Sequence, residues 1–270
     1  MRVLFLGDIF GRPGRHAVGK WLGRFRARES IDFVIANAEN AAGGKGITVE
    51  ILHELLDMGI EVLTGGNHSF SQRESLPLFN EDPRLLRPAN LPPGAPGRGV
   101  GIYESAAGVQ VAVINLQGRA FMTPSDCPFR RADQILAELA GRAGVIIVDF
   151  HAEATSEKMA MAHYLDGRVA AVIGTHTHVP TADARVSPAG TAAVSDVGMC
   201  GPFDSVIGVQ SRIIIDHMLT GVPARHQVAR HDARVCAALI HIDPAGGRAR
   251  RIEQIIEPPF KTRTGAEGDQ

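Results

Sequence analysis

The stretch Ala171-Val-Ile-Gly-Thr-His176-Thr-His178 shows the pattern that decides the fold, a short apolar run that ends in polar side chains. The same pattern occurs four more times, at Val3-Leu-Phe-Leu-Gly-Asp8, Phe33-Val-Ile-Ala-Asn-Ala-Glu39-Asn40, Val62-Leu-Thr-Gly-Gly-Asn67-His68 and Val145-Ile-Ile-Val-Asp-Phe-His151. Brief continuous apolar runs are typical of strands that are buried on both faces. In open α/β sheets, ligands bind outside the carboxyl ends of the strands. We therefore expect these five polar ends to meet in one cleft.

The segments between the runs predict helices and hairpins. Amphipathic helices are expected to stop at Gly59, Gly141 and Gly221. Two pairs of adjacent apolar segments predict antiparallel hairpins, 100–104 with 109–114 and 235–242 with 249–256. Residues 80–99, which contain five prolines, are expected to form an internal crossover. The fold class predicted from these elements is α/β, with sheets that are partly antiparallel.

Length and composition exclude several classes of protein. A chain of 270 residues can bury a large core unaided, and we expect one domain over residues 1–260 with a polar tail at 261–270. The net charge of −1 and the 5% of aromatic residues argue against binding of long nucleic acid. Three isolated cysteines offer no thiol motif, and no apolar run approaches the length of a membrane span. We expect a cytoplasmic protein with no membrane contact that forms a homo-oligomer.

The polar strand ends supply seven oxygen and nitrogen donors, with His68 beside them. The seven are Asp8, Glu39, Asn40, Asn67, His151, His176 and His178. Because a catalytic zinc ion usually takes only three protein ligands, this set predicts two metal ions. Donors without sulfur suit iron, manganese or zinc, and they do not decide among the three. We expect the His-x-His pair to place both imidazoles on one side of an extended segment.

Each of these residues taken singly is more typical of a turn or of a satisfied hydrogen bond. Glycines at positions 7, 65, 66 and 174 favour a site because they allow the backbone to approach closely there. Near the cluster, Lys45 in Gly43-Gly-Lys-Gly46 and Arg12 at the start of a predicted helix are candidates for binding a substrate anion. A plain connecting loop and an arginine that faces solvent are the alternatives.

Longer motifs resemble the YmdB-type branch of the calcineurin-like metallophosphoesterases. The matching stretches include Gly7-Asp-Ile-Phe-Gly-Arg-Pro-Gly-Arg15, Asn37-Ala-Glu-Asn-Ala-Ala-Gly-Gly-Lys-Gly46, Gly66-Asn-His68, Asp149-Phe-His-Ala-Glu-Ala-Thr-Ser-Glu-Lys158, Gly174-Thr-His-Thr-His-Val179 and Asp196-Val-Gly-Met199. The resemblance runs from residue 1 to about residue 257. It implies a four-layer α/β/β/α sandwich of two mixed sheets and a bacterial dinuclear phosphodiesterase that acts on cyclic nucleotides.

The resemblance also implies how the donors divide between two ions, with iron or manganese expected and zinc as an alternative. One ion takes Asp8, Glu39, Asn40 and His178, and the other takes Glu39, Asn67, His151 and His176. The wider superfamily has Asp-x-His where this chain has Asp8-Ile-Phe10, and in this branch Asn40 takes the place of that histidine. Asn37 and Glu153 are candidates for supporting the ligands from behind.

The mechanism expected from this set is hydrolysis of a small phosphodiester by a hydroxide that bridges the two metals, with His68 as general acid. An orienting hydrogen bond is the alternative role for His68. The substrates expected are 2′,3′-cyclic nucleotides, with 3′,5′-cyclic nucleotides as a further class. The alternatives are a regulatory protein that binds metal and nucleotide with little turnover, and a phosphomonoesterase.

Overall fold

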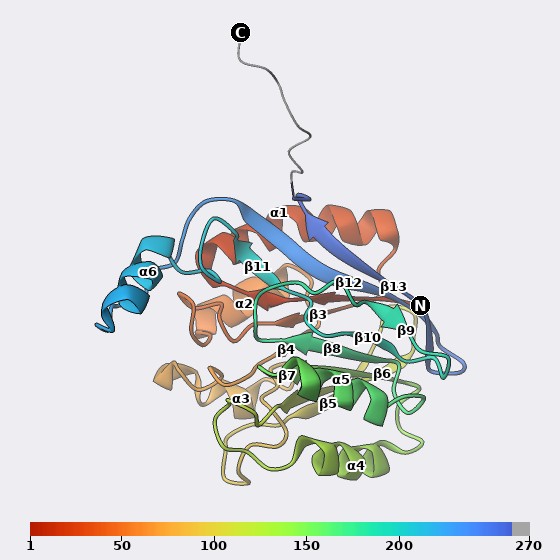
Figure 1. Ribbon diagram of the computed structural model, residues 1–270. Coiled ribbons are helices and arrows are strands. Elements are labelled where there is room, and N and C mark those ends of the chain that lie inside the picture. The colour runs from red at the N-terminus through yellow and green to blue at the C-terminus, as the bar shows by residue number, and fades with distance from the viewer. Residues whose placement is uncertain (261–270) are drawn as a thin grey trace.

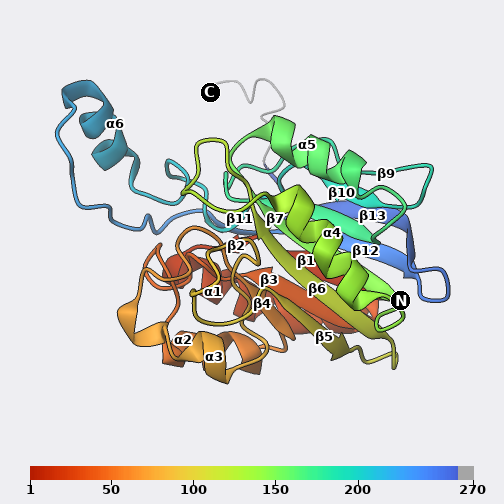
Figure 2. The same ribbon diagram turned by 90° about the horizontal axis from the view of Figure 1, so that it is seen from below.

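Two β-sheets pack face to face in the computed structural model, which describes residues 1–260 (Figures 1 and 2). The strands of the first sheet lie in the order β2-β11-β12-β1-β3-β4, and β13 pairs with β12. Their bounds are β1 Arg2–Leu6, β2 Asp8–Ile9, β3 Phe33–Asn37, β4 Val62–Thr64, β11 Met199–Pro202, β12 Ala233–Asp243 and β13 Arg248–Glu257. β1 runs parallel to β3 and antiparallel to β12, so this sheet is mixed.

The second sheet has the strand order β5-β6-β7-β8-β10-β9. Its strands are β5 Val100–Glu104, β6 Gln110–Gln117, β7 Val145–His151, β8 Ala171–Thr175, β9 Arg185–Val186 and β10 Ala192–Val194. β6, β7, β8 and β10 are parallel, and the edge strands β5 and β9 are antiparallel to their neighbours. The parallel strands therefore point their carboxyl ends toward the same edge.

Alternate residues of the inner strands face two different cores, which makes four layers. Leu4 and Leu6 of β1 pack outward against the helices α1 (Gly11–Glu29) and α2 (Val49–Asp57). Val3 and Phe5 face the second sheet, and they share one core with residues of β6, β7 and β8. The outer face of the second sheet packs on α4 (Pro128–Leu139) and α5 (Thr155–Tyr164). The predicted α/β/β/α sandwich of two mixed sheets is thereby confirmed.

The segment between β4 and β5 carries the chain from one sheet to the other. It contains a 3-10 helix (Arg73–Ser75) and α3 (Leu78–Glu81), followed by residues that are in neither a helix nor a strand. Isolated bridges join Leu85 to Leu63 and Leu86 to Arg98, so the proline-rich part is held against β4. The predicted crossover is confirmed.

Most of the predicted boundaries agree with the structure. Both hairpins form, as β5–β6 and β12–β13. Gly59, Gly141 and Gly221 each follow the end of a helix within two residues and have positive φ. The short strands β9, β10 and β11 were not predicted, because segments of two to four residues carry little periodicity. The predicted polar tail lies outside the described residues.

The last helix, α6 (Ser211–Thr220), projects from the sandwich and contains no buried residue (Figure 1). Within residues 1–260, none of the helices combines the length and the apolar character that crossing a membrane requires.

Candidate metal centre

The seven donors predicted from the sequence come from both sheets. Asp8 lies in β2 and His151 is the last residue of β7. The other five follow the carboxyl ends of β3, β4 and β8: Glu39, Asn40, Asn67, His176 and His178. All of them are buried or half-buried.

One group of donors converges on the Nε2 atom of His151. Glu39 Oε1, Asn67 Oδ1 and His176 Nδ1 each lie 3.0 Å from this nitrogen. Because three acceptor atoms and an imidazole nitrogen come this close in a buried site, the group fits a cation at its centre.

A second group lies around the Nε2 atom of His178. This nitrogen is 3.3 Å from Asn40 Oδ1 and 3.8 Å from Asp8 Oδ1. Asp8 is fully buried, and its Oδ1 atom has no hydrogen-bond partner within residues 1–260. A buried carboxylate oxygen without a donor is costly, and a cation would satisfy it.

Each of the three histidines is oriented by a hydrogen bond on the side that faces away from the centre. His151 Nδ1 lies 2.9 Å from Thr175 Oγ1, His176 Nε2 lies 3.0 Å from Glu153 Oε2, and His178 Nδ1 lies 2.9 Å from the carbonyl oxygen of Ile207. In a neutral imidazole, these partners accept the ring proton and leave the lone pair of the opposite ring nitrogen directed at the donors. Histidines that bind metals are held in the same way.

The Thr175 contact belongs to a buried network that the sequence analysis missed. Thr175 Oγ1 donates to Asp149 Oδ1 at 2.7 Å, and Thr64 Oγ1 donates to Asp149 Oδ2 at 2.5 Å. Asn37, a predicted supporting residue, donates from Nδ2 to the same Asp149 oxygen at 3.1 Å. One sequence feature could have revealed this network: Asp149 is an acidic residue inside an otherwise apolar strand, two positions before His151.

Burial and close contacts shift the pKa values of the donors. Burial would raise the pKa of Glu39, but the charge and hydrogen bond of His151 lower it to about 2. Burial would lower the pKa of His151, but Glu39 raises it to about 9. Burial, reinforced by the charge of His151, lowers the pKa of His176 to about 3, and burial raises the pKa of Asp8. Cations and protons therefore compete for the same atoms here.

Glycine allows the turn after β4 to approach the donors. A Cβ atom at Gly66 would lie 2.2 Å from His151 Cδ2 and 2.4 Å from Glu39 Oε2. Any other residue would therefore displace two of the donors. At Gly174, a Cβ atom would lie 1.8 Å from the carbonyl oxygen of Ser195. The close approach predicted for these two glycines is confirmed.

The His176-Thr177-His178 segment is not extended, so the prediction that both imidazoles lie on one side of an extended strand was wrong. β8 ends at Thr175, and φ is +101° at His176 and +67° at His178. Asp196 Oδ2 holds the turn between them, because it accepts from Thr177 N at 3.0 Å and from Thr177 Oγ1 at 2.8 Å. The turn directs the two imidazoles to different groups of donors.

The remaining candidates lie around this cluster. His68 donates from its backbone N to Glu39 Oε2 at 2.8 Å, and burial lowers the pKa of its half-buried imidazole. Lys45 is exposed, and its charge contributes to that lowered pKa, so it lies near His68. Arg12 is exposed on the first turn of α1, whereas Arg15 is tied to Glu54 at 2.7 Å.

Known proteins match the chain over nearly its whole length. A family profile described as "YmdB-like protein" matches residues 4–255. A Bacillus subtilis (strain 168) protein named 2′,3′-cyclic-nucleotide 2′-phosphodiesterase is 46% identical over 95% of this chain and 97% of its own length.

Two solved structures are also similar. A hypothetical protein from Thermus thermophilus has a TM-score of 0.89 and 44% identity, and the match covers 95% of this chain and 98% of that one. A novel phosphatase from Mycoplasma pneumoniae has a TM-score of 0.89 and 33% identity, covering 95% and 92% of the two chains. The profile match and these identities show that the chain belongs to the YmdB-like protein family.

Proposed function

We propose that this protein is a metal-dependent phosphodiesterase that hydrolyses 2′,3′-cyclic nucleotides to nucleoside 3′-phosphates. The observation that carries the proposal is the orientation of His151, His176 and His178, each held by a hydrogen bond on one ring nitrogen with the other directed at oxygen donors. The name of the Bacillus relative supplies the substrate class. Compounds with a 3′,5′-cyclic phosphate are a further substrate class within the proposal.

Two ions fit the two groups of donors. Asp8, Glu39, Asn40 and His178 would hold one, and Glu39, Asn67, His151 and His176 would hold the other. Asn40 Nδ2 donates to the carbonyl oxygen of Gly44 at 3.0 Å, which turns its Oδ1 toward the centre. When bound, such ions lower the pKa of a water molecule and neutralise charge on phosphoryl oxygens. The oxygen and nitrogen donors favour iron or manganese, with zinc as the alternative.

The chain itself supplies the proton for the leaving group. In the reaction a water molecule gives up one proton to solvent and its oxygen bonds to phosphorus, the P–O2′ bond breaks, and O2′ gains a proton from a donor. His68 is next to Asn67 on the turn after β4, and we assign it this proton donation. Burial lowers the pKa of His68 in the free protein. An anionic phosphodiester beside the imidazole would raise that pKa and favour the protonated form.

The exposed cations Arg12 and Lys45 are proposed to attract the substrate anion. Because the net charge of the chain is only −1, no field of the whole molecule does so. We also propose that the protein forms a homo-oligomer and is located in the cytoplasm.

One assay tests the function. Protein purified without chelator is analysed for metals and then supplied with 2′,3′-cyclic AMP, 3′,5′-cyclic AMP, a bis-ester reporter and a monoester reporter under the same metal-replete conditions. We expect metal in the protein, fastest turnover of the 2′,3′-cyclic compound, and adenosine 3′-phosphate as the product. Fastest turnover of the monoester would make the protein a phosphomonoesterase. Retention of nucleotide without product would make it a regulatory binding protein.

A further inference from the structure

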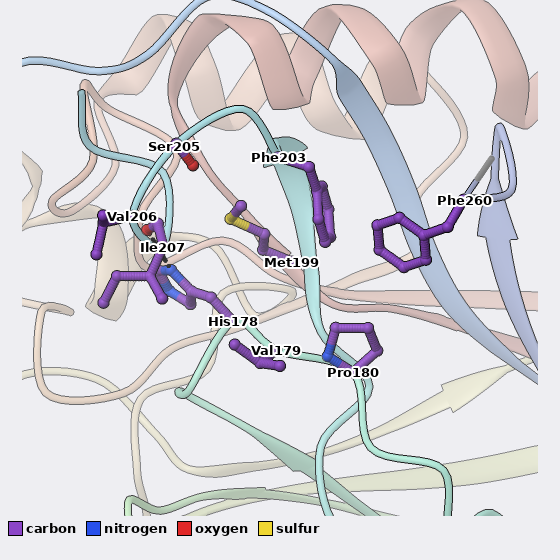
Figure 3. A pocket seen from close by; sticks show the side chains of 9 residues that line it. All are labelled: His178, Val179, Pro180, Met199, Phe203, Ser205, Val206, Ile207 and Phe260. Atoms are coloured by element: carbon purple, nitrogen blue, oxygen red, sulfur yellow. Dashed lines mark hydrogen bonds between the residues drawn. The ribbon is translucent and has the colours of Figure 1, made fainter. Parts of the chain in front are cut away.

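An apolar pocket of about 440 Å³ opens beside the candidate metal centre (Figure 3). Its walls come from β11, from the loop that follows this strand, and from the residues after His178. The volume falls within the range of 300–1,000 Å³ that is usual for small-molecule sites.

The pocket and the centre share a wall. His178 lines the pocket, while its Nε2 atom faces Asn40 at 3.3 Å. Met199, in the pocket lining, pairs in register with Asp8 on the adjacent strand. One bound molecule can therefore place an anionic group at the centre and another part of itself in the pocket.

Two aromatic rings form one side of this pocket. Phe203 and Phe260 pack edge to face, with ring centroids 5.4 Å apart. Figure 3 shows both rings on one side of the space, with His178 and Ile207 on the other. The guanidinium of Arg234 lies 4.6 Å from the centroid of Phe260 and 6.0 Å from that of Phe203. The contacts with Arg234 and between the two rings hold the rings in a position where a flat aromatic group can lie against them.

The pocket offers few polar partners. Among the lining residues in the described part of the chain, only His178 and Ser205 have polar side chains. Ser205 Oγ donates to the carbonyl oxygen of Pro202 and accepts from Gly208 N at 2.8 Å, so its hydrogen bonds are already used. His178 is committed to Ile207 and to the donors. The lining therefore suits an apolar, flat group and not a sugar or a charged one.

We infer that this pocket holds the nucleobase of the substrate whose phosphodiester lies at the donors. The inference rests on the proposed function and adds a specificity site to it. Phe203 and Phe260 contribute by stacking and apolar contact, which every nucleobase can use because each has a π face.

The test compares a substrate that has a base with one that lacks it. The metal-replete protein is assayed with 2′,3′-cyclic AMP and with glycerol 1,2-cyclic phosphate, which has the same five-membered ring and no base. Phe203→Ala and Phe260→Ala should each lower the ratio of kcat/KM for the two substrates by about tenfold, through loss of a stacking contact. The control, Tyr164→Ala, removes an aromatic residue on α5 outside the pocket and should leave the ratio unchanged. An unchanged ratio in both pocket variants would overturn the inference.

A binding measurement separates failure of the pocket from failure of the proposed function. Calorimetry with adenosine 3′-phosphate should show a Kd about tenfold weaker in each pocket variant, whereas binding of inorganic phosphate should not change. Phe260 is 49% exposed, so its removal leaves the core intact. The Phe260→Ala variant therefore still tests the pocket if the Phe203→Ala variant fails to fold. If no cyclic phosphate is hydrolysed by the unmodified protein, the proposed function fails, and the calorimetry still tests the pocket. Equal weakening for both ligands would contradict the inference.

Discussion

Glu39 uses both of its carboxylate oxygens at the centre. Oε1 lies 3.0 Å from His151 Nε2, and Oε2 accepts from the backbone N of His68 at 2.8 Å. The carboxylate thus contacts a metal-binding candidate and orients the turn that carries the proposed acid. A change at this one residue should affect ion binding and proton donation together.

Glu39→Gln keeps the size of the side chain and removes its charge. We expect this variant to lose metal and to fall in kcat/KM by at least about 100-fold, since even residues that only orient ligands cost 10–100-fold. Elemental analysis and the 2′,3′-cyclic AMP assay measure both effects. Glu54→Gln, on the outer helix α2, is the control and should keep its metal and its activity. A Glu39→Gln protein with full metal content and full activity would contradict a role for the charge of Glu39 at the centre.

His68→Ala should separate chemistry from ion binding. The variant should keep its metal and lose about 100- to 10,000-fold in kcat, the range that general acid catalysis usually contributes. Metal content and steady-state kinetics give the two readouts. If kcat is unchanged, His68 is not the proton donor, and an orienting hydrogen bond becomes its role.

At the scale of elements, the strand ends could be predicted and the turn after β8 could not. Asp8, His151 and the residues that follow β3 and β4 were predicted because parallel buried strands share one edge. The two-residue period assumes an extended chain, so it misplaced His176 and His178, which have positive φ. Their geometry depends on Asp196, 18 residues further along the chain than His178, and no local pattern encodes that contact.

The hydrogen-bond network around Asp149 could not be predicted from the sequence for a related reason. Its partners come from both sheets: Thr175 lies on β8, beside the strand of Asp149, whereas Thr64 and Asn37 lie on β4 and β3 of the first sheet. Periodicity tells which face of a strand is buried, but it does not tell which residues of two packed sheets meet.

Lys158 on α5 anchors the same turn through Asp196. Its Nζ lies 2.7 Å from Asp196 Oδ2, and the two side chains are only 3% and 1% exposed. Lys158→Met should lower the free energy of unfolding by about 3–5 kcal/mol, because Asp196 keeps a buried charge without its partner. The same variant should bind metal more weakly, since the turn carries His176 and His178.

The matched control for Lys158→Met is Arg168→Met, which breaks the exposed pair of Arg168 with Asp133. Exposed pairs contribute at most about 1 kcal/mol. Urea unfolding of both variants measures the difference. Equal losses in the two variants would show that the Lys158–Asp196 pair does not stabilise the turn.

At the scale of the whole molecule, the centre joins the two sheets. Asp8, Glu39 and Asn67 come from the first sheet, and His151, His176 and His178 come from the second. Ions bound to both sets would cross-link the layers of the sandwich.

Removal of metal should therefore lower thermal stability. A ligand at about 100 times its Kd adds about 2.7 kcal/mol, which corresponds to a fall in Tm of about 5–10 °C on chelation in a chain of this size. Calorimetry before and after chelation, with Mn²⁺ added back, measures the shift. Glu39→Gln should show little shift on chelation, and a shift as large as that of the unmodified protein would contradict its place in the centre.

The pairing of β1 with β12 has a consequence for the order in which the chain folds. Leu4 is paired in register opposite Leu239, and the amino terminus donates to the carbonyl oxygen of Ile242 at 2.8 Å. The first strand thus gains one of its neighbours only after residues 233–243 have been synthesised, and such distant pairings form slowly. During synthesis, Asp8 of β2 therefore lies beside a first sheet that is still incomplete. Under the proposed function, the part of the centre that holds Asp8 would therefore reach its final geometry late, when the first sheet closes.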